Sequence, residues 1–141
     1  MEKLSLVEKD GERIVWQLEA ENASQEPRGM HLIEPQLELF TESGQSIPVR
    51  GREAWFDPTS RNIHFKGEVV VDYKDWRLTS EVLDYDSTKQ EMFIPGAFRI
   101  QGDGIRARGK SMRMNRGTQR LWVENGVWIE DSRPQTWGKP S

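Results

Sequence analysis

Apolar and polar residues alternate with a period of two along most of the chain. The alternation is clearest in five segments, which read VWQLEA (15–20), QLELF (36–40), NIHFKGEVVV (62–71), EMFIPGAFRI (91–100) and RLWVENGVWI (120–129). This period is typical of β-strands, in which successive side chains point to opposite faces of a sheet. Clusters of Gly, Asn, Asp, Pro and Ser separate the segments and favour hairpin turns. No segment has sustained helical spacing, so the pattern predicts an all-β protein.

The later part of the chain repeats at an interval of 29 residues. A large apolar or aromatic residue (Phe56, Tyr85, Met114) is followed each time by a residue that can open a turn (Asp57, Asp86, Asn115). The strand after each turn has apolar residues at matching positions in all three copies. They are Ile63, Met92 and Leu121, then Phe65, Ile94 and Val123, then Val69, Phe98 and Val127, then Val71, Ile100 and Ile129. Because these positions share one parity, we predict a continuous apolar wall on one face of three hairpins.

The strand before each turn predicts a bend. Its inward positions are Val49, Gly51, Ala54 and Phe56 in the first copy, Leu78, Ser80, Leu83 and Tyr85 in the second, and Ala107, Gly109, Met112 and Met114 in the third. The parity changes between the second and third members, which predicts a β-bulge at Gly51, Ser80 and Gly109. Pro95 predicts a break in the hydrogen-bond ladder of its strand. Repeated bent hairpins with one dry face predict a curved antiparallel β-jelly roll or a solenoid of hairpins.

Composition narrows the class of protein. A chain of 141 residues is the length of one domain. Its 20 basic and 23 acidic residues are interspersed, which argues against nucleic acid as a partner. The absence of Cys excludes disulfides and thiolate metal sites. No apolar run is long enough to span a bilayer, and the charged start MEKLSLVEKDGERI is unlike a secretory signal, so the sequence predicts a soluble chain as given.

The order and spacing of these segments resemble the LptC family of lipopolysaccharide-export proteins, which is related to the periplasmic OstA-like, or LptA, bridge proteins. The resemblance rests on VWQLEAENA (15–23), LELFTESGQSIPVRGREAWFD (37–57), IHFKGEVVV (63–71), LTSEVLDYD (78–86) and FRIQGDGIRARGKSMRMN (98–115). It covers the chain from about Gly11 to about Asp131. We therefore expect a polar lead-in (1–10), an LptC-like jelly-roll domain (11–131) and a polar tail (132–141).

The resemblance implies a non-enzymatic lipid carrier without a cofactor. A groove in the jelly roll would receive the acyl chains of lipopolysaccharide and pass them from the inner-membrane ABC transporter to the next bridge protein. Free strand edges would join successive jelly rolls, with the transporter at the N-terminal edge and an LptA-like protein at the C-terminal edge. The same edges would let two copies of the chain pair as a homodimer.

Members of this family are held at the periplasmic face of the inner membrane by one N-terminal span, which this chain lacks. The segment MEKLSLVEKDGERI resembles the polar stretch that follows the anchor. We therefore expect that the anchor was removed from this chain; the alternative is a soluble OstA-like bridge protein.

The first candidate site is the inward wall, which would hold acyl chains. Each buried methylene contributes about 0.8 kcal/mol, or on the order of 10 kcal/mol for one chain, so a carrier needs a dry surface. The alternative is that the same residues only fill a closed core. The residues of the wall are Phe56, Ile63, Phe65, Val69, Val71, Leu83, Tyr85, Met92, Ile94, Phe98, Ile100, Met112, Met114, Leu121, Val123, Val127 and Ile129.

The second candidate site is the edge of the last predicted strand, where a partner protein would add a strand. Its residues are Trp122, Val127, Trp128 and Ile129. Two outward Trp residues on a terminal strand would either meet that partner or pack under the polar C-terminal tail.

Other classes of site have less support. His31 and His64 lie far apart in the sequence, without a carboxylate at metal-ligand spacing, so no metal site is predicted. The recurrence of Asp57 and Asp86 with the repeat indicates turn formation rather than acid–base catalysis. Basic residues near strand ends would either meet lipid phosphates or form a solvated face; they are Arg50, Arg52, Arg106, Arg108, Lys110 and Arg113. A carbohydrate-binding jelly roll is the alternative function, with Trp55, Trp76, Trp122, Trp128 and Trp137 as aromatic platforms.

Overall fold

The computed structural model of the chain describes residues 2–131, with side chains over residues 3–124. These residues form eleven β-strands and include no helix, so none of the described segments is a helix that could cross a membrane. The strands are β1 Glu2–Asp10, β2 Arg13–Glu26, β3 Gly29–Ile33, β4 Gln36–Phe40, β5 Ser46–Arg50, β6 Glu53–Phe56, β7 Ile63–Tyr73, β8 Trp76–Asp86, β9 Glu91–Gly102, β10 Ile105–Asn115 and β11 Leu121–Asp131. The prediction of an all-β fold is confirmed.

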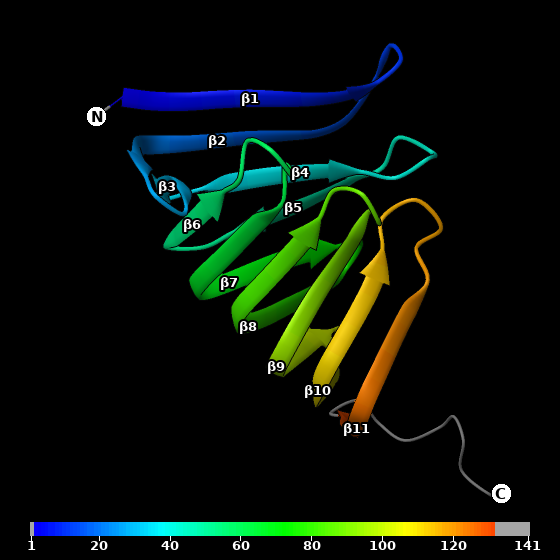
Figure 1. The fold of residues 1–141 in the computed structure, drawn as a ribbon. Helices are drawn as coiled ribbons and strands as arrows, with labels where there is room; N and C mark the ends of the chain where they lie inside the picture. The colour runs from blue at the N-terminus through cyan, green and yellow to red at the C-terminus, as the bar shows by residue number, and fades with distance from the viewer. Residues whose placement is uncertain (1, 132–141) are drawn as a thin grey trace, which may run out of the picture.

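All eleven strands belong to one antiparallel sheet that curls on itself (Figure 1). Strands β2 to β7 close into a ring, because β7 pairs with both β5 and β6 while β2 pairs with both β3 and β4. The ring is completed by the pairs β3–β6 and β4–β5. Strands β8 to β11 continue from β7 as consecutive neighbours, and β1 lies along β2 at the other end. The result is the predicted curved jelly roll, closed toward its N-terminal end and open toward its C-terminal end.

A bend halfway along each long strand divides the sheet into two layers. The start of β7, Ile63–Lys66, pairs with β6, whereas Val70 and Val71 pair with β5. Register shifts mark the bend between Lys66 and Val69 in β7, between Ser80 and Asp84 in β8, and next to Gly109 in β10. We call the half that contains β3, β6 and the turns at 57–62, 87–90 and 116–119 the first layer. The half that contains β4, β5 and the turns at 74–75 and 103–104 is the second layer.

The predicted ladder break at Pro95 is confirmed. In the pairing with β10, Ile94 and Ala97 have partners, but Pro95 and Gly96 between them have none. The pairing with β8 likewise jumps from Phe93 to Phe98. The break therefore coincides with the bend of β9, where the ladder is already interrupted.

The first copy of the repeat departs from the single bent strand that we predicted. Residues 46–56 form two strands, because β5 ends at Arg50 and β6 begins at Glu53. The backbone of Gly51 donates to the carbonyl of Pro35, and that of Arg52 donates to the carbonyl of Gly67. The two halves thus go to different layers at the point where the later copies only bend.

The sheet begins before residue 11. Residues 2–10, which we expected to be a lead-in outside the domain, form β1 in register with β2. Leu4 and Leu6 stand opposite Ala20 and Leu18 and pack against the core, although charged residues surround them in the sequence.

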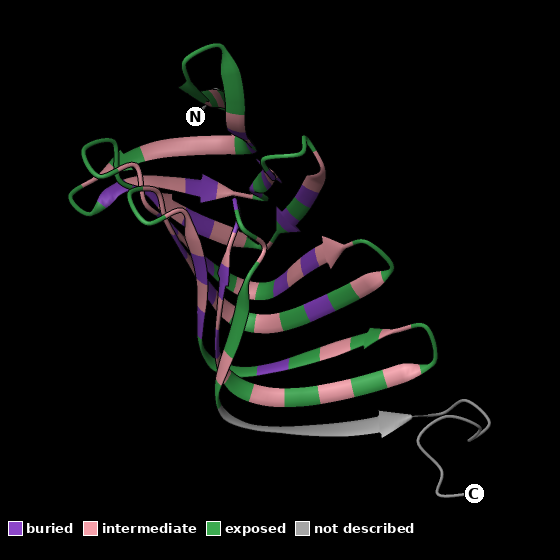
Figure 2. Ribbon diagram, turned by 90° about the vertical axis from the view of Figure 1, so that its right-hand side faces the viewer, coloured by how far each residue is buried: buried purple, intermediate pink, exposed green. Residues whose placement is uncertain are grey.

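The core lies between the two layers. Figure 2 shows buried residues alternating with exposed ones along the strands of the closed part, whereas β10 is mostly intermediate or exposed. The alternation follows from the pleat, which sends successive side chains to opposite faces. The inner faces of both layers therefore form the predicted wall.

Candidate functional site

Most of the predicted inward wall lines the space between the two layers. Twelve of its residues are buried with at most 4% of their surface exposed: Phe56, Ile63, Phe65, Val69, Val71, Leu83, Tyr85, Met92, Ile94, Phe98, Met112 and Met114. The pairing explains why they meet, since Phe65 stands opposite Leu83, and Met92 stands opposite both Tyr85 and Met114. Their inward orientation is confirmed.

The wall becomes exposed at its C-terminal end. Ile100 on β9 and Val123 on β11 are only partly buried, and Leu121 is 51% exposed. Leu121 stands directly opposite Met114 and so faces the same side of the sheet. It is exposed because β11 is the last strand and no described residue covers it. Val127, Trp128 and Ile129 belong to β11, but their side chains fall outside the part of the chain whose side chains are described.

Strands β2 to β4 extend the wall at its N-terminal end, which the sequence analysis did not anticipate. The added residues are almost fully buried; they are Trp16, Leu18, Leu32, Leu37 and Leu39. The alternation in the segments 15–20 and 36–40 carried the signal. These strands lie outside the 29-residue repeat, so the repeat alone did not connect them to the wall.

Polar contacts close one side of the jelly roll, where turns of the first layer meet strands of the second layer. Arg61, in the turn before β7, forms an ion pair with Glu8 of β1. The guanidinium of Arg116, in the turn after β10, donates to the carbonyl of Phe40 at 2.9 Å. The hydroxyl of Tyr73 in the second layer bonds to the amide of Gln119. These three contacts join the layers, and two of them come from the turn between β10 and β11.

Tyr85 illustrates how dry the closed part is. Its side chain is 1% exposed, and burial raises the pKa of its hydroxyl above the ordinary value, although the nearby guanidinium of Arg116 acts in the opposite direction. Removing the hydroxyl from water disfavours the charged form of the group. The hydroxyl of Tyr85 is therefore shielded from water at this point.

The two terminal strands leave a free edge each. β1 pairs only with β2, and β11 pairs only with β10. One row of backbone N–H and C=O groups on each strand therefore has no strand partner within the described chain. Trp122 lies on the outer face of β11 with 45% of its surface exposed, and Val7 of β1 is 42% exposed. The outward position predicted for Trp122 is confirmed.

The recurring Asp and Asn residues form turns. Asp57 Oδ1 accepts from the backbone N–H of Thr59 at 2.8 Å, and Asp86 Oδ1 accepts from that of Lys89 at 3.0 Å. Asn115 Oδ1 accepts from the backbone N–H groups of Gly117 and Thr118, both at 2.9 Å. These short polar side chains cap the turn in the same way in each repeat.

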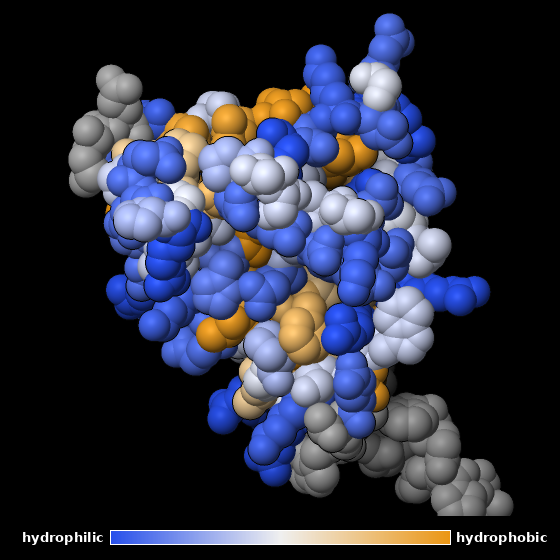
Figure 3. All heavy atoms as spheres, in the orientation of Figure 1, coloured by the Kyte–Doolittle hydropathy of each residue, from blue (hydrophilic) through white to orange (hydrophobic). Residues whose placement is uncertain are grey.

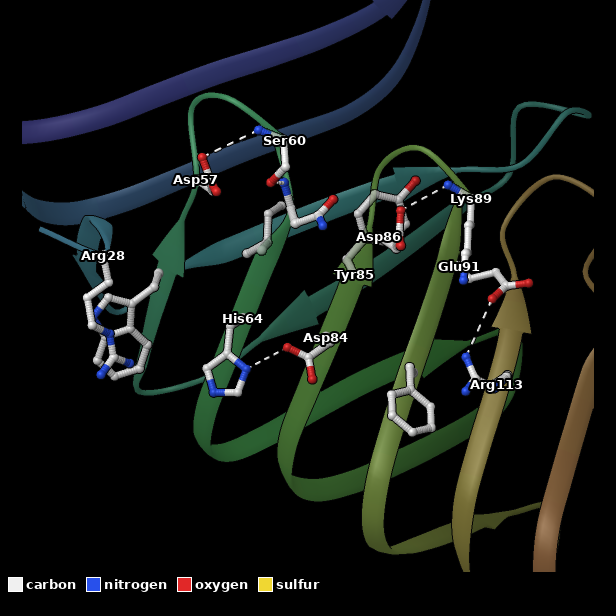
Figure 4. Close-up of a pocket in the computed structure, with 14 residues that line it drawn as sticks. Arg28, Asp57, Ser60, His64, Asp84, Tyr85, Asp86, Lys89, Glu91 and Arg113 are labelled. Atoms are coloured by element: carbon white, nitrogen blue, oxygen red, sulfur yellow. Dashed lines mark hydrogen bonds and ion pairs between the residues drawn. The ribbon is translucent and has the colours of Figure 1, made fainter.

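The outer face of the first layer is mostly hydrophilic, with small hydrophobic patches between the charged groups (Figure 3). His64 points outward, as predicted, and its Nδ1 lies 2.5 Å from Asp84 Oδ1 (Figure 4). His31 lies between Glu53 and Glu26. No group of three His, Asp or Glu side chains that could hold a metal ion occurs among the residues whose side chains are described.

Several of the basic residues near strand ends are paired with carboxylates. Arg52 contacts Glu68 at 2.8 Å, and Arg113 contacts Glu124 at 3.1 Å. Because both pairs are exposed, they form a solvated charged face at these positions.

Two comparisons connect this architecture to known proteins. The sequence matches the family described as "Lipopolysaccharide-assembly, LptC-related" over residues 3–129. The fold is similar to the crystal structure of LptH from Pseudomonas aeruginosa, the LptA homologous periplasmic component of its lipopolysaccharide transport device. The TM-score is 0.60 at 10% sequence identity, over 84% of this chain and 95% of that chain. No curated protein matches the sequence.

Proposed function

Because the chain belongs to the LptC-related family of lipopolysaccharide-assembly proteins, we propose that it is a non-enzymatic carrier of lipopolysaccharide acyl chains. The chains enter the wall at its open C-terminal end, between the inner faces of β9, β10 and β11. The protein receives them from the inner-membrane ABC transporter and passes them to a bridge protein. It acts at the periplasmic face of the inner membrane.

The observation that supports this proposal is the gradient of exposure along a single row of the wall. Met92 and Met114 are 4% exposed, whereas Leu121, the next residue of the same row, is 51% exposed. A closed core would end in a covering element, but here the apolar row runs out into solvent among the described residues. An acyl chain laid against Val123 and Leu121 would continue the row and remove apolar surface from water.

The chemistry of the wall suits an irregular apolar guest. Met92, Met112 and Met114 lie next to one another on β9 and β10, buried beside the exposed end of the wall on β11. Methionine is unbranched and polarisable, and adapts its shape to fill irregular gaps. Each acyl methylene that leaves water there contributes about 0.8 kcal/mol. Each further carbon in contact with the wall therefore adds to the binding of the lipid.

A photo-crosslinking residue on each face of β9 tests the carrier role. We expect a crosslinker at Phe98 or Ile100, which face inward, to capture intact lipopolysaccharide. A crosslinker at Arg99, between them on the outer face, should capture at least about tenfold less, because the lipid chain contacts one face of the strand only. The measurement is the yield of crosslinked product on a denaturing gel.

Deacylated lipopolysaccharide provides the control. Removal of the acyl chains should abolish capture at Phe98 and Ile100, since the sugar portion has no apolar surface to bury there. Equal labelling at Arg99 and Ile100, or equal capture of the deacylated molecule, would contradict the proposal.

The free edges have a separate role in the proposed pathway. The N-terminal edge at β1 joins the transporter, and the C-terminal edge at β11 joins an LptA-like bridge protein by strand addition. The free edge of β11 supports this part of the proposal, because an unpaired strand edge is a template for another strand. The exposed ring of Trp122 beside that edge supplies apolar contact area for the partner.

Single prolines at Val127, Trp128 and Ile129 test the C-terminal edge. In an antiparallel ladder the N–H groups of successive residues point alternately to opposite edges of the strand. A proline whose residue faces β10 removes a hydrogen bond of the ladder, whereas a proline whose residue faces outward removes only a donor at the free edge. The second kind should leave the thermal unfolding curve close to that of wild type and weaken bridge-protein binding by about tenfold or more in calorimetry. Unchanged binding by a folded free-edge variant would refute the role of β11.

A further inference from the structure

The two layers meet again on the side opposite their bends. There the turn between β10 and β11 (116–119), which belongs to the first layer, reaches the ends of β4 and β7 in the second layer. Figure 1 shows this turn arching from β10 toward the end of β4. We call the line along which the turn meets the two strands the mouth. What holds the mouth closed decides whether the wall is accessible from this side.

Two hydrogen bonds cross the mouth. The guanidinium of Arg116 donates to the carbonyl of Phe40 at 2.9 Å, and the hydroxyl of Tyr73 donates to the side-chain oxygen of Gln119. No backbone–backbone hydrogen bond joins the turn to β4 or β7 among the described residues. Each bond of this kind shifts an equilibrium only about threefold to tenfold, because water replaces a lost partner. The mouth is therefore held weakly.

The burial of Arg116 weakens the closed mouth further. Arg116 is only 5% exposed, and its Nε is a buried donor without a partner among the described residues. Its charge lies beside two neutral groups, the carbonyl of Phe40 and the hydroxyl of Tyr85. A buried cation with an unsatisfied donor destabilises the conformation that buries it. Separation of the layers at the mouth would return the guanidinium to water and remove this cost.

The bends on the other side of the layers provide a hinge. In β9, Pro95 and Gly96 have no partner in either neighbouring strand. In β10, Ser111 interrupts the ladder to β9 and has φ +59°, a conformation that is uncommon for a residue with a side chain. Beyond them, β11 pairs only with β10. A small rotation at the bends would therefore separate the layers at the mouth without breaking a backbone ladder.

The same side of the molecule is fastened more firmly at the ring. Arg61, in the turn before β7, forms an ion pair with Glu8, and its guanidinium lies 5.4 Å and 5.6 Å from the ring centroids of Trp16 and Phe56. The strands of the ring also pair on both edges, so its layers cannot rotate apart without breaking backbone hydrogen bonds. Movement is therefore confined to the end where the wall is exposed.

We propose that the mouth opens about the bends of β9 to β11, that the contacts of Arg116 and Tyr73 are its latch, and that an acyl chain enters the wall sideways through it. The guest then replaces the latch as the link between the layers, because its chain contacts both inner faces. The opening follows from the latch and the hinge alone. Only its use for lipid entry rests on the proposed function.

Spin labels on the full chain test the opening, because a chain without Cys is labelled only at introduced positions. Thr118→Cys and Asp75→Cys place one label on each side of the mouth, at exposed turn residues. Pulsed electron–electron double resonance measures the distance between them. Tyr73→Phe, which removes only the latching hydroxyl, should raise the ratio of long to short distances about fivefold. A single distance that is the same with and without Tyr73→Phe would overturn the proposal, as would two distances in an unchanged ratio.

A second pair of labels is the matched control. Glu12→Cys and Thr59→Cys are exposed turn positions on the same side of the molecule at the ring, and should give one narrow distance that Tyr73→Phe leaves unchanged. An equal change in both pairs would indicate general loosening of the fold and would overturn the latch.

Intact lipopolysaccharide separates the two parts of the proposal. It should shift the first pair of labels to the long distance. If the wall crosslinkers capture the lipid but the distances do not change, the sideways entry is wrong and the carrier function stands. If they capture no lipid, the carrier function and the sideways entry are wrong, and the label distances of the free protein still decide whether the mouth opens.

Discussion

One position of the repeat forms its turn with a carboxylate in two copies, Asp57 and Asp86, and with an amide in the third, Asn115. An Asp carboxylate and an Asn amide each present an oxygen to the backbone N–H groups that follow. The amide does so at any pH, whereas the carboxylate is the better acceptor only when it is ionised. The backbone N–H groups of Thr59 and then Ser60 hold the pKa of Asp57 below its ordinary value. The turn at Asp57 is therefore sensitive to acid.

The contribution of Asp57 to stability should disappear at low pH. Because its pKa is lower in the folded chain than in the unfolded chain, its stabilisation is present above the unfolded pKa and is lost as the pH falls through the folded pKa. The difference in Tm between wild type and Asp57→Ala should thus be constant near neutral pH and shrink below about pH 4. Thermal melts followed by circular dichroism from pH 7 to pH 2 would measure it.

Asn115→Ala is the matched control for that experiment. It removes the same kind of turn contact from the third repeat, but the amide does not titrate, so the loss of this contact adds no pH dependence of its own to the Tm difference. A constant difference for Asp57→Ala across the whole pH range would contradict the argument.

The outward residues of the first layer could have been found from the sequence, but the position of Arg28 could not. Trp55, Asp84 and Arg113 are spaced by the interval of the repeat, and so are His64, Phe93 and Trp122. Arg28 comes from the turn before β3, outside the repeat, so no pattern in the sequence predicts that its guanidinium lies over the ring of Trp55. The exposure of Leu121 was equally hidden, because it depends on what covers a strand rather than on the residue itself.

Among the elements, the bent hairpins were predictable because the inward positions change parity in the sequence of each copy. The split of the first copy into β5 and β6 was not, since Gly51 occupies the same position as Gly109, where the strand continues. The difference comes from neighbours, as β3 and β4 take the two halves to separate layers. β1 was hidden by its charged residues, and β3, which reads GMHLI, has one polar side chain, His31, and so shows no clear alternation.

The bend of β7 depends on a backbone conformation that favours glycine. Gly67 has φ +91°, and a Cβ there would lie 3.2 Å from the Cβ of Arg52. Gly67→Ala should lower the free energy of unfolding by about 1–2 kcal/mol, because a side chain is strained at positive φ. Equilibrium unfolding in urea would measure the loss.

Gly96 occupies the position of Gly67 in the next repeat and provides a matched control. A Cβ there would meet nothing within 4 Å, and its φ is not positive. Gly96→Ala should therefore change the free energy of unfolding by less than about 0.5 kcal/mol. Equal effects at the two positions would mean that the bend of β7 does not depend on the glycine.

At the scale of the whole molecule, the most fully paired part of the fold and the accessible part of the wall lie at opposite ends. The ring of β2 to β7 has partners on both edges of its strands and a core with almost no exposed surface. The open end has one terminal strand that pairs on one side and an inner face that is only partly covered. Under the proposed function, one half of the molecule maintains the fold and the other half holds the contacts with the lipid.

Hydrogen exchange should reproduce this separation. Backbone amides of β2, β4 and β7 should exchange most slowly, and those of β10 and β11 at least about tenfold faster, since segments with few buried contacts open at lower free energy. Mass spectrometry of exchanged peptides would measure the gradient. Under the proposed function, lipopolysaccharide should slow exchange in β9 to β11. Equal protection of β7 and β11 in the free protein would contradict the separation.

The constant interval of 29 residues has an evolutionary consequence. Each unit pairs with the next through the same alternation of apolar and polar positions. A further unit could therefore be added beyond the ring. Duplication of the gene segment that encodes one hairpin would insert a further unit without changing the strands at either terminus. The fold can thus grow or shrink by whole hairpins, and related proteins can reach different lengths while keeping the same two ends.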